Sequence, residues 1–504
     1  MAGVQPAAAQ ALQPESEVRA PSWLDKQLLR ELPNEWRKAY LFFACAVMLI
    51  LLTASMINPP TISTFTDSVG LDKQPTAQAY LPLVLLPVLF LYNFLWTALK
   101  SPALLVATLS FIYATVYFLI AIRSLSENRI EPWLAWILFY ASNTKSVLFP
   151  VMLWSVMNDV STSQYSKVAY PALVLAQQIG GIAGSLWTTN VSHVGGTTGL
   201  LFAQAVLLVL LAFCVWRACA LAASAPVERD AEAAAGTSLQ PVAGAAGEPL
   251  VASAGSALGQ TGQNRCLTGC KAVGSKMWEL VEGIYLIFTK PFVAGIFWVA
   301  CAHLVPRTIL DYQGTALINE RWPKIVDGVK IPGNKDKQTA FFAWCNLANT
   351  FGAALLSVLG LRKLIDRGGL ALTLSACPLV MLIGVLLVCF FHNFWTVQIV
   401  LVLVNIVQYA LNGPSREMLY VQTSKEIKYK AKSWSDMYGN FLQKFVGAMI
   451  NNNVNKELPS CTPHCFNATF SGLFTVGWCA FWGVVAAVLG LKHAQLVRDG
   501  QKIS

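Results

Sequence analysis

Long apolar runs separated by short polar stretches follow one another along most of the chain. A transmembrane helix needs about 20 consecutive, mostly apolar residues, and most of these runs have that length. In the first part of the sequence they occupy residues 39–57, 79–99, 102–122, 132–157, 168–189 and 200–221. In the second part they occupy residues 291–317, 341–361, 370–391, 395–411, 437–451 and 470–491. The pattern predicts an all-α polytopic membrane protein with about twelve transmembrane helices, six in each half.

The polar stretches between and around these runs predict the domain order. Residues 222–275 are rich in Ala, Gly and Ser, which is typical of a flexible linker. The N-terminal tail has no basic region ahead of a short apolar core, so it does not resemble a secretory signal. The expected order is a cytosolic tail (1–38), a six-helix half (39–221), a cytosolic linker (222–275), a second six-helix half (276–491) and a cytosolic tail (492–504).

Composition agrees with a membrane protein and argues against other classes. Of the 504 residues, 55% are hydrophobic and only 12% are charged, whereas soluble proteins carry about 25% charged residues. The net charge of +10 has a first explanation in the Lys and Arg of cytosolic loops, without any nucleic acid partner. Attraction of an anionic solute is a second explanation. No cysteine spacing resembles a metal site, and no phosphate-binding loop or hydrolase motif occurs, so we expect no cofactor, no metal and no enzyme activity.

Basic loops and acceptor motifs predict the orientation of the chain. The basic stretches 362–367 and 424–432 would lie on the cytosolic side, together with both tails and the linker. The N-x-S/T motifs at Asn190 and Asn467 then fall on the outer side, as expected of a glycoprotein. Cys461 and Cys465 lie in the same outer loop as Asn467 and are candidates for a disulfide, which would persist in an oxidising compartment. These features favour the plasma membrane or the endomembrane system.

Several ionisable residues lie inside the predicted spans. A charge at membrane depth costs about 2.5–3.5 kcal/mol on insertion scales, so each needs a reason. Arg307 and Asp311 are four residues apart on one helix face, and they either form an internal ion pair or face a cavity. Lys145 and Lys444 have no acidic partner at helical spacing in their own spans, so we predict that they face a cavity. Cations facing a cavity would suit a multiply charged anion such as a phosphate ester.

The basic stretch 412–450 divides into three parts. Residues 414–420 end the tenth span and are predicted to face the substrate, with Arg416 and Glu417 as the candidate side chains. Residues 424–432 are predicted to be an orienting cytosolic loop, so their lysines are not counted as ligands. Lys444 returns to membrane depth on the eleventh span.

Two family resemblances rest on this organisation and on three short stretches. Two six-helix halves joined by a linker resemble the major-facilitator transporters, and residues 360–368 loosely match their G-x-x-x-D-R-x-G turn. The second family is the nucleotide (ATP/ADP) translocases of plastids and intracellular bacterial parasites. The stretch LWSVMND at 153–159 resembles their F-W-x-x-A-N-[DE] pattern. The stretch YSKVAYP at 165–171 resembles the E-A-K-R-x-Y-P pattern that follows it. LDYQ at 310–313 is similar to their D-Y-Q stretch. PSREMLYV at 414–421 and KYKAKSWSD at 428–436 resemble D-P-[TC]-K-E-M-A-Y-I-P and K-x-K-[AG]-K-x-x-x-D.

The resemblance implies a nucleotide-binding ATP:ADP antiporter or a nucleotide importer that works by alternating access between two halves. The implied partners are a nucleotide or another small anionic solute and the lipid bilayer, and a plastid envelope becomes a further possible location. The charges inside the spans and the resemblance together give the candidate substrate-binding residues, which are Lys145, Asp311, Gln313, Arg416, Glu417 and Lys444.

The chain also departs from the translocase pattern. Asn58 and the residues after it stand where the translocases carry R-D-T-K-D, and Ser142 stands near the position of their span-four Glu. Arg416 replaces a Lys, which keeps the charge but changes the hydrogen-bonding geometry. Two alternatives therefore remain: a carrier of another organic anion or phosphate ester, and a non-transporting membrane receptor or scaffold with the same fold.

Overall fold

The structure, a computed structural model, consists almost entirely of helices. It describes residues 32–99, 101–127, 130–160, 163–224, 285–326, 329–331, 333–359, 361–391, 393–421, 423, 427, 435–455 and 470–499. The first half contains α2 (Asn34–Ser68), η1 (Leu71–Lys73), α3 (Gln74–Ala79), α4 (Leu81–Leu99), α5 (Pro102–Glu127), α6 (Pro132–Val160), α7 (Ser163–Thr189), η2 (Val191–Val194) and α8 (Gly196–Ser224). The predicted linker lies outside the described residues, apart from its first three positions, which end α8.

The second half repeats this helical pattern with more interruptions. It contains α11 (Pro291–Cys301), α12 (Leu304–Arg321), α13 (Asn334–Leu359), α14 (Leu361–Phe390), α15 (Phe394–Val407), η4 (Gln408–Asn412), α16 (Gly413–Val421), η6 (Ser435–Gly439), α18 (Asn440–Ile450), η7 (Asn451–Asn455) and α20 (Phe470–Arg498). Between α12 and α13 the short strands β1 (Ile325–Val326) and β2 (Val329–Lys330) pair antiparallel. Segments η4, η6 and η7 are π-helical.

Each of the twelve predicted spans coincides with helix in the structure, so the predicted all-α polytopic fold is confirmed. Among the described residues, eight helices are long and apolar enough to cross a membrane, or nine if the bent pair Leu71–Ala79 and Leu81–Trp96 forms one span. Helices α6, α7 and α18 are not among these. They carry more polar side chains, and α6 and α18 turn some of them toward the interior of the molecule.

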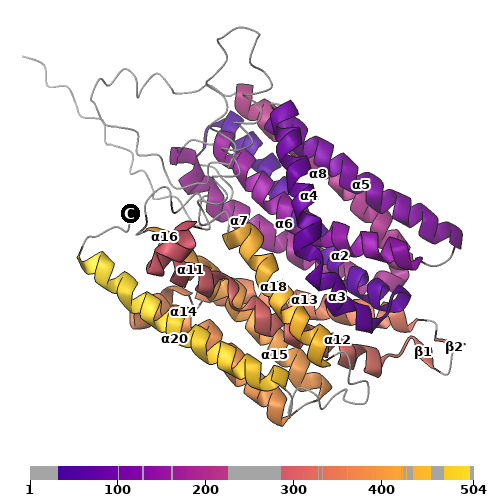
Figure 1. The fold of residues 1–504 in the computed structure, drawn as a ribbon. Helices are drawn as coiled ribbons and strands as arrows, with labels where there is room; N and C mark the ends of the chain where they lie inside the picture. Colours follow the sequence, from indigo (N-terminus) through magenta and orange to yellow (C-terminus); the bar gives the residue numbers. More distant parts are fainter. Residues whose placement is uncertain are drawn as a thin grey trace, which may run out of the picture.

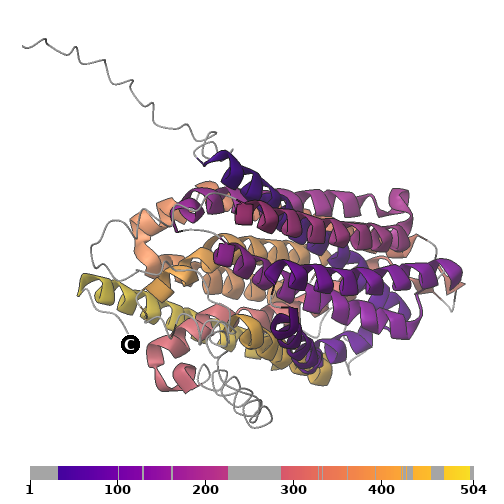
Figure 2. The ribbon, with the colours of Figure 1, turned by 90° about the horizontal axis from the view of Figure 1, so that it is seen from above.

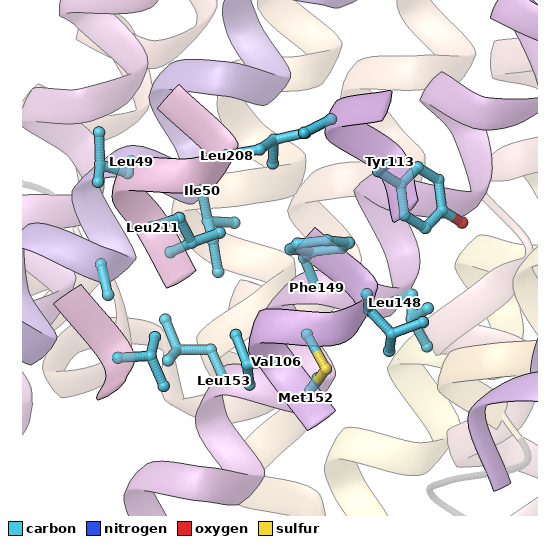
Figure 3. Packing of buried hydrophobic residues seen from close by; sticks show 14 of the residues in the cluster. Leu49, Ile50, Val106, Tyr113, Leu148, Phe149, Met152, Leu153, Leu208 and Leu211 are labelled. Atoms are coloured by element: carbon cyan, nitrogen blue, oxygen red, sulfur yellow. The ribbon is translucent and has the colours of Figure 1, made fainter. Parts of the chain in front are cut away.

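The two halves lie side by side, and each contains one large hydrophobic core (Figure 1). Most helices run in nearly the same direction (Figure 2). Figure 3 shows the first core, where Ile50 of α2, Val106 of α5, Phe149 of α6 and Leu208 of α8 meet. These side chains are fully or almost fully buried. Phe441 of α18 joins the first core with Tyr438 packed against it, so the interface between the bundles has apolar as well as polar contacts.

Glycines let α7 approach α2 closely within the first half. A Cβ at Gly180 would lie 2.1 Å from the carbonyl oxygen of Met48, and one at Gly184 would lie 2.3 Å from that of Leu52. Real side chains cannot come so near a backbone oxygen, so only glycine fits at these two positions. Small residues at such crossings are common where helices pack in membranes.

The halves touch each other mainly through α13, which lies against α2 and α7, and α18, which lies against α3. Some of these contacts lie at the end of the molecule where β1 and β2 are found, opposite the C-terminus (Figure 1). The last turns of α2 and the first turns of α13 meet at this end.

Candidate functional site

A cavity of about 600 Å³ lies between the two halves. Helices α2, α3 and α6 contribute one wall, and α12, α13, α15, η4, α16 and α18 contribute the other. The polar and charged lining side chains are Asn58, Thr61, Gln74, Gln78, Asn143, Ser146, His303, Arg307, Thr308, Asp311, Thr315, Asn346, Asn349, Gln398, Asn405, Gln408, Tyr409, Arg416, Asn440 and Lys444. A polar cavity between two helical bundles is the usual position of a transporter's substrate site.

Four charged side chains from three helices gather in this cavity. Arg307 and Asp311 lie one turn apart on α12, with 3.4 Å between Nε and Oδ2. Lys444 of α18 is close enough to interact electrostatically with both of them. Arg416 of α16 joins the same cavity wall. The ion pair and the cavity position, which the sequence offered as alternatives for Arg307 and Asp311, are therefore both observed.

Helix geometry explains why Lys444 points toward the cavity. Phe441 and Lys444 are three residues apart and share one face of α18, and both line the cavity. The Nζ of Lys444 lies 5.5 Å from the centre of the Phe441 ring, a cation–π distance. The ammonium group lies over the aromatic ring, so the two side chains form a pair at the cavity wall.

A polar network at the cavity wall is built around the π-helical turn η4. Gln408 Oε1 accepts hydrogen bonds from Asn412 Nδ2 at 3.0 Å and from Cys377 Sγ at 3.1 Å. Gln408 Nε2 donates to His303 Nδ1 at 3.3 Å. Pro414 has no backbone N–H to offer to the carbonyl of Ala410, which removes one α-helical hydrogen bond just beyond this turn. Such π-turns are frequent at functional sites.

The first-half wall of the cavity carries no ionisable side chain among those that the structure describes. Asn58 and Thr61 of α2, Gln74 and Gln78 of α3, and Asn143 of α6 supply neutral polar groups instead. The charge of the site is therefore concentrated on the second half, and hydrogen-bonding amides face it from the first.

The prediction that Lys145 faces a cavity is wrong. Its side chain is 2% exposed and lies inside the first bundle. With the amide of Gln204 oriented to satisfy both neighbours, Gln204 Oε1 accepts from Lys145 Nζ at 2.9 Å and Gln204 Nε2 donates to the carbonyl of Thr53 at 3.1 Å. Successive residues of an α-helix are rotated by about 100°. Asn143 faces the cavity, so Lys145, two residues later, points to the far side of α6.

The prediction that Gln313 binds the substrate is wrong for the same reason. Asp311 and Thr315 of α12 line the cavity, whereas Gln313 is buried and is not part of the lining. Its position between two cavity-facing residues of one helix face turns it toward the packed interior of the second half. The resemblance to the D-Y-Q stretch therefore contributes Asp311 to the site and leaves Gln313 outside it.

The remaining predicted residues have different outcomes. Asn190 is exposed, and its Nδ2 donates to the carbonyl of Leu186 at 3.1 Å; its glycosylation stays a prediction. Cys461, Cys465 and Asn467 lie outside the described residues. The backbone of Glu417 belongs to α16, but its side chain lies outside those described.

Several cavity residues were not among the predicted ligands. His303 lies at the break between α11 and α12, and Asn346, Asn349 and Asn405 lie on α13 and α15. Asn346 and Asn349 are three residues apart, a spacing that places both amides on one face of a predicted span. That spacing was a usable signal, because amides are costly in lipid unless they face a polar interior. In the described part of the chain, no group of three or more His, Cys, Asp or Glu side chains could hold a metal ion.

Comparison with known proteins shows the fold. No protein-family model matches the chain, and no curated protein matches its sequence. A crystal structure of an auto-inhibited POT family peptide transporter matches 92% of this chain and 97% of its own, at 13% identity and a TM-score of 0.54. The chain shares the fold of this solved transporter structure.

Two further solved structures agree with this. A mutant of the nucleoside transporter NupG covers 90% of this chain and 99% of its own, at 13% identity and a TM-score of 0.56. A bacterial homolog of the human lysosomal transporter Spinster, in an inward-facing and unoccupied conformation, covers 92% and 99%, at 11% identity and a TM-score of 0.53. The chain is thus an integral, multi-pass membrane protein with the fold of small-solute transporters.

Proposed function

We propose that the chain carries nucleotides, or related phosphate-bearing organic anions, across a membrane by alternating access. One observation carries this proposal: Arg307, Arg416 and Lys444, from three different helices, converge on the cavity between the halves. Hydrogen bonds from cationic donors to phosphate are stronger than neutral ones, and Arg and Lys are the side chains that bind phosphate most often. Their position between two bundles is where a rocking carrier holds its solute.

Two further observations favour a nucleotide over other anions. The stretch that most resembles the nucleotide translocases, together with the lysine that follows it in span eleven, contributes Arg416 and Lys444 to the cavity. A transporter that shares this fold is a nucleoside transporter. The resemblance adds ATP:ADP exchange as the mode of transport to be tested first.

Polar contacts between the halves support an alternating mechanism. At the end near β1, Lys324 Nζ donates to the carbonyl of Ser63 at 2.7 Å and to the hydroxyl of Thr66 at 2.5 Å. The hydroxyls of Ser63 and Thr339 lie 2.5 Å apart. Such hydrogen bonds can be exchanged for water at small cost, whereas a fused hydrophobic core could not separate. The halves can therefore part at this end while each bundle stays intact.

Exchange in proteoliposomes tests the proposal. Vesicles containing the full chain and loaded with unlabelled ADP should take up labelled ATP, ADP or AMP, and uptake should require nucleotide inside. Lys444→Gln should reduce uptake at least about tenfold, since it removes one charge-assisted contact. Arg123→Gln, which changes an exposed cation outside the cavity lining, is the matched control and should transport normally. If no labelled nucleotide exchanges while the protein elutes as a folded, monodisperse species, the proposal is wrong.

A further inference from the structure

Two amides that line the cavity are held in a fixed orientation. Asn143 Nδ2 of α6 donates to the carbonyl of Phe139 at 2.9 Å, and Gln398 Nε2 of α15 donates to the carbonyl of Gly314 at 3.0 Å. A backbone carbonyl only accepts hydrogen bonds, so the group that faces it must be the NH2 group. The oxygens of both amides have no hydrogen-bond partner in the described part of the chain. Asn143 and Gln398 thus offer acceptors to the cavity from opposite halves.

Close packing fixes the position of Gln398. A Cβ at Gly314 would lie 3.1 Å from Gln398 Nε2 and 2.8 Å from Leu401 Cδ1, so the missing side chain lets the amide reach the backbone of α12. Gln398 is 6% exposed, which leaves its amide little room to turn. A hydrogen-bonding group that is held in this way is prepared for its ligand before the ligand arrives.

Hydroxyl groups of the lining present acceptors as well. Ser146 Oγ of α6 donates to the carbonyl of Ser142 at 2.7 Å, and Thr315 Oγ1 of α12 donates to the carbonyl of Asp311 at 2.7 Å. A hydroxyl group has one hydrogen atom, so once that atom is engaged only the oxygen lone pairs remain. These two groups therefore offer acceptors to a solute while the bonds to their carbonyls persist.

Four further amides of the lining have oxygens without a hydrogen-bond partner among the described residues; they belong to Gln74, Gln78, Asn349 and Asn405. Buried polar groups are nearly always hydrogen-bonded, and an exception calls for an explanation. Asn405 lies about two helical turns after Gln398 on α15, so these two amides belong to one helix face. The described neutral side chains of the lining thus leave several acceptors for which the protein supplies no donor.

We propose that the cavity contains a subsite that selects hydrogen-bond donors on the uncharged part of the solute, with Asn143 and Gln398 as its specificity-determining residues. The groups that fit are N–H and O–H groups. A carbonyl in the same place would set one acceptor against another and leave the amide oxygen unpaired, which is costly in a site shielded from water. This inference rests on the proposed function and deepens it. For a nucleotide, the groups that distinguish one base from another by this rule are the exocyclic amino groups.

Nucleotides that differ at one edge of the base test this selection. ATP carries an amino group at C6 of the purine where inosine triphosphate carries an oxo group, and CTP differs from UTP in the same way at C4. Both members of a pair have the same phosphate and ribose groups. In each pair we expect the amino member to bind the purified full chain at least about tenfold more tightly, because the oxo member leaves acceptors unpaired. Calorimetry at one pH and one salt concentration measures the ratio.

Substitutions at the two amides test their role. Asn143→Leu and Gln398→Met keep the approximate shape of the side chain and remove the amide, so each should lower the ratio of ATP to inosine triphosphate affinity several-fold. Affinity for inorganic triphosphate, which has no base, should stay the same in both, whereas Lys444→Gln should lower it. Gln495→Met, at an exposed position of α20 outside the lining, is the matched control for Gln398→Met and should leave the ratio unchanged.

The outcomes distinguish this inference from the function on which it rests. Equal binding of the amino and oxo members to the folded wild-type protein overturns the subsite and leaves the nucleotide carrier standing. The same holds if both variants weaken the two members equally or leave the ratio unchanged. If neither the nucleotides nor inorganic triphosphate bind to folded protein, both proposals are wrong. Melting curves without ligand show whether each variant is folded, and the remaining variant decides when one is not.

Discussion

Two lysines at membrane depth show how much depends on the direction of a single side chain. Lys145 and Lys444 both lie in apolar spans without an acidic partner at helical spacing. Lys444 lines the central cavity, whereas Lys145 hydrogen-bonds to Gln204 inside the first bundle. The same residue type therefore has a candidate substrate role in one helix and a packing role in another.

A substitution at Lys145 separates these roles. Lys145→Gln removes a buried charge whose hydrogen-bond acceptor is neutral and keeps an N–H donor for Gln204. Replacing buried charges by neutral groups that fit is often neutral or stabilising. We expect an unchanged or higher melting temperature and nucleotide affinity within about twofold of the wild type. Melting curves and calorimetry on the purified protein would check this, and a loss of binding as large as that in Lys444→Gln would contradict the assignment.

At the scale of elements, the crossing of α2 and α7 depends on the absence of a side chain. A Cβ at position 184 would lie 2.3 Å from the carbonyl oxygen of Leu52, so the helices must separate to admit it. Overpacking of this kind costs about 1–3 kcal/mol. Gly477 on α20 has nothing within 4 Å of the corresponding position, so the two sites form a matched pair.

We therefore expect Gly184→Ala to lower the melting temperature clearly, and Gly477→Ala to leave it unchanged or to raise it slightly. Alanine is favoured over glycine in a helix by about 0.8–1.0 kcal/mol, so the second variant gains helix propensity without a clash. Thermal unfolding of both variants in the same detergent gives the comparison. Equal melting temperatures for the two variants would show that α2 and α7 pack less tightly than their glycines indicate.

For the whole molecule, the proposed alternating access requires that the halves move relative to each other. Ser63 of α2 and Thr339 of α13 belong to different halves, and their hydroxyl oxygens lie 2.5 Å apart. A covalent bond at this point should hold the end near β1 closed and stop the cycle. Ser124 of α5 and Thr198 of α8 lie 2.9 Å apart within the first half, where a bond should leave the movement of the halves free.

The pair Ser63→Cys with Thr339→Cys should thus lose transport on oxidation and regain it on reduction. The pair Ser124→Cys with Thr198→Cys should crosslink without losing transport. Uptake into proteoliposomes, measured before and after reductant, reports the effect, and the thiols remaining free report the extent of crosslinking. Full transport by a completely crosslinked first pair would exclude separation of the halves at this end.

The sequence by itself determined the helices and their grouping. Backbone polar groups cannot stay unpaired in lipid, so each long apolar run must form a helix, and all twelve predicted spans do. It also singled out Asp311, Arg416 and Lys444, because charge in an apolar run needs a polar destination.

Only the tertiary structure decided which polar groups face the cavity. A polar side chain avoids lipid equally well in a substrate cavity and in the interior of a bundle, so the sequence pattern cannot tell these destinations apart. The rotation of each helix about its axis settles the matter, and that rotation is set by packing against neighbouring helices. Lys145 and Gln313 lie on the packed sides of α6 and α12 for this reason, while the amides of α3, α13 and α15 form the cavity wall.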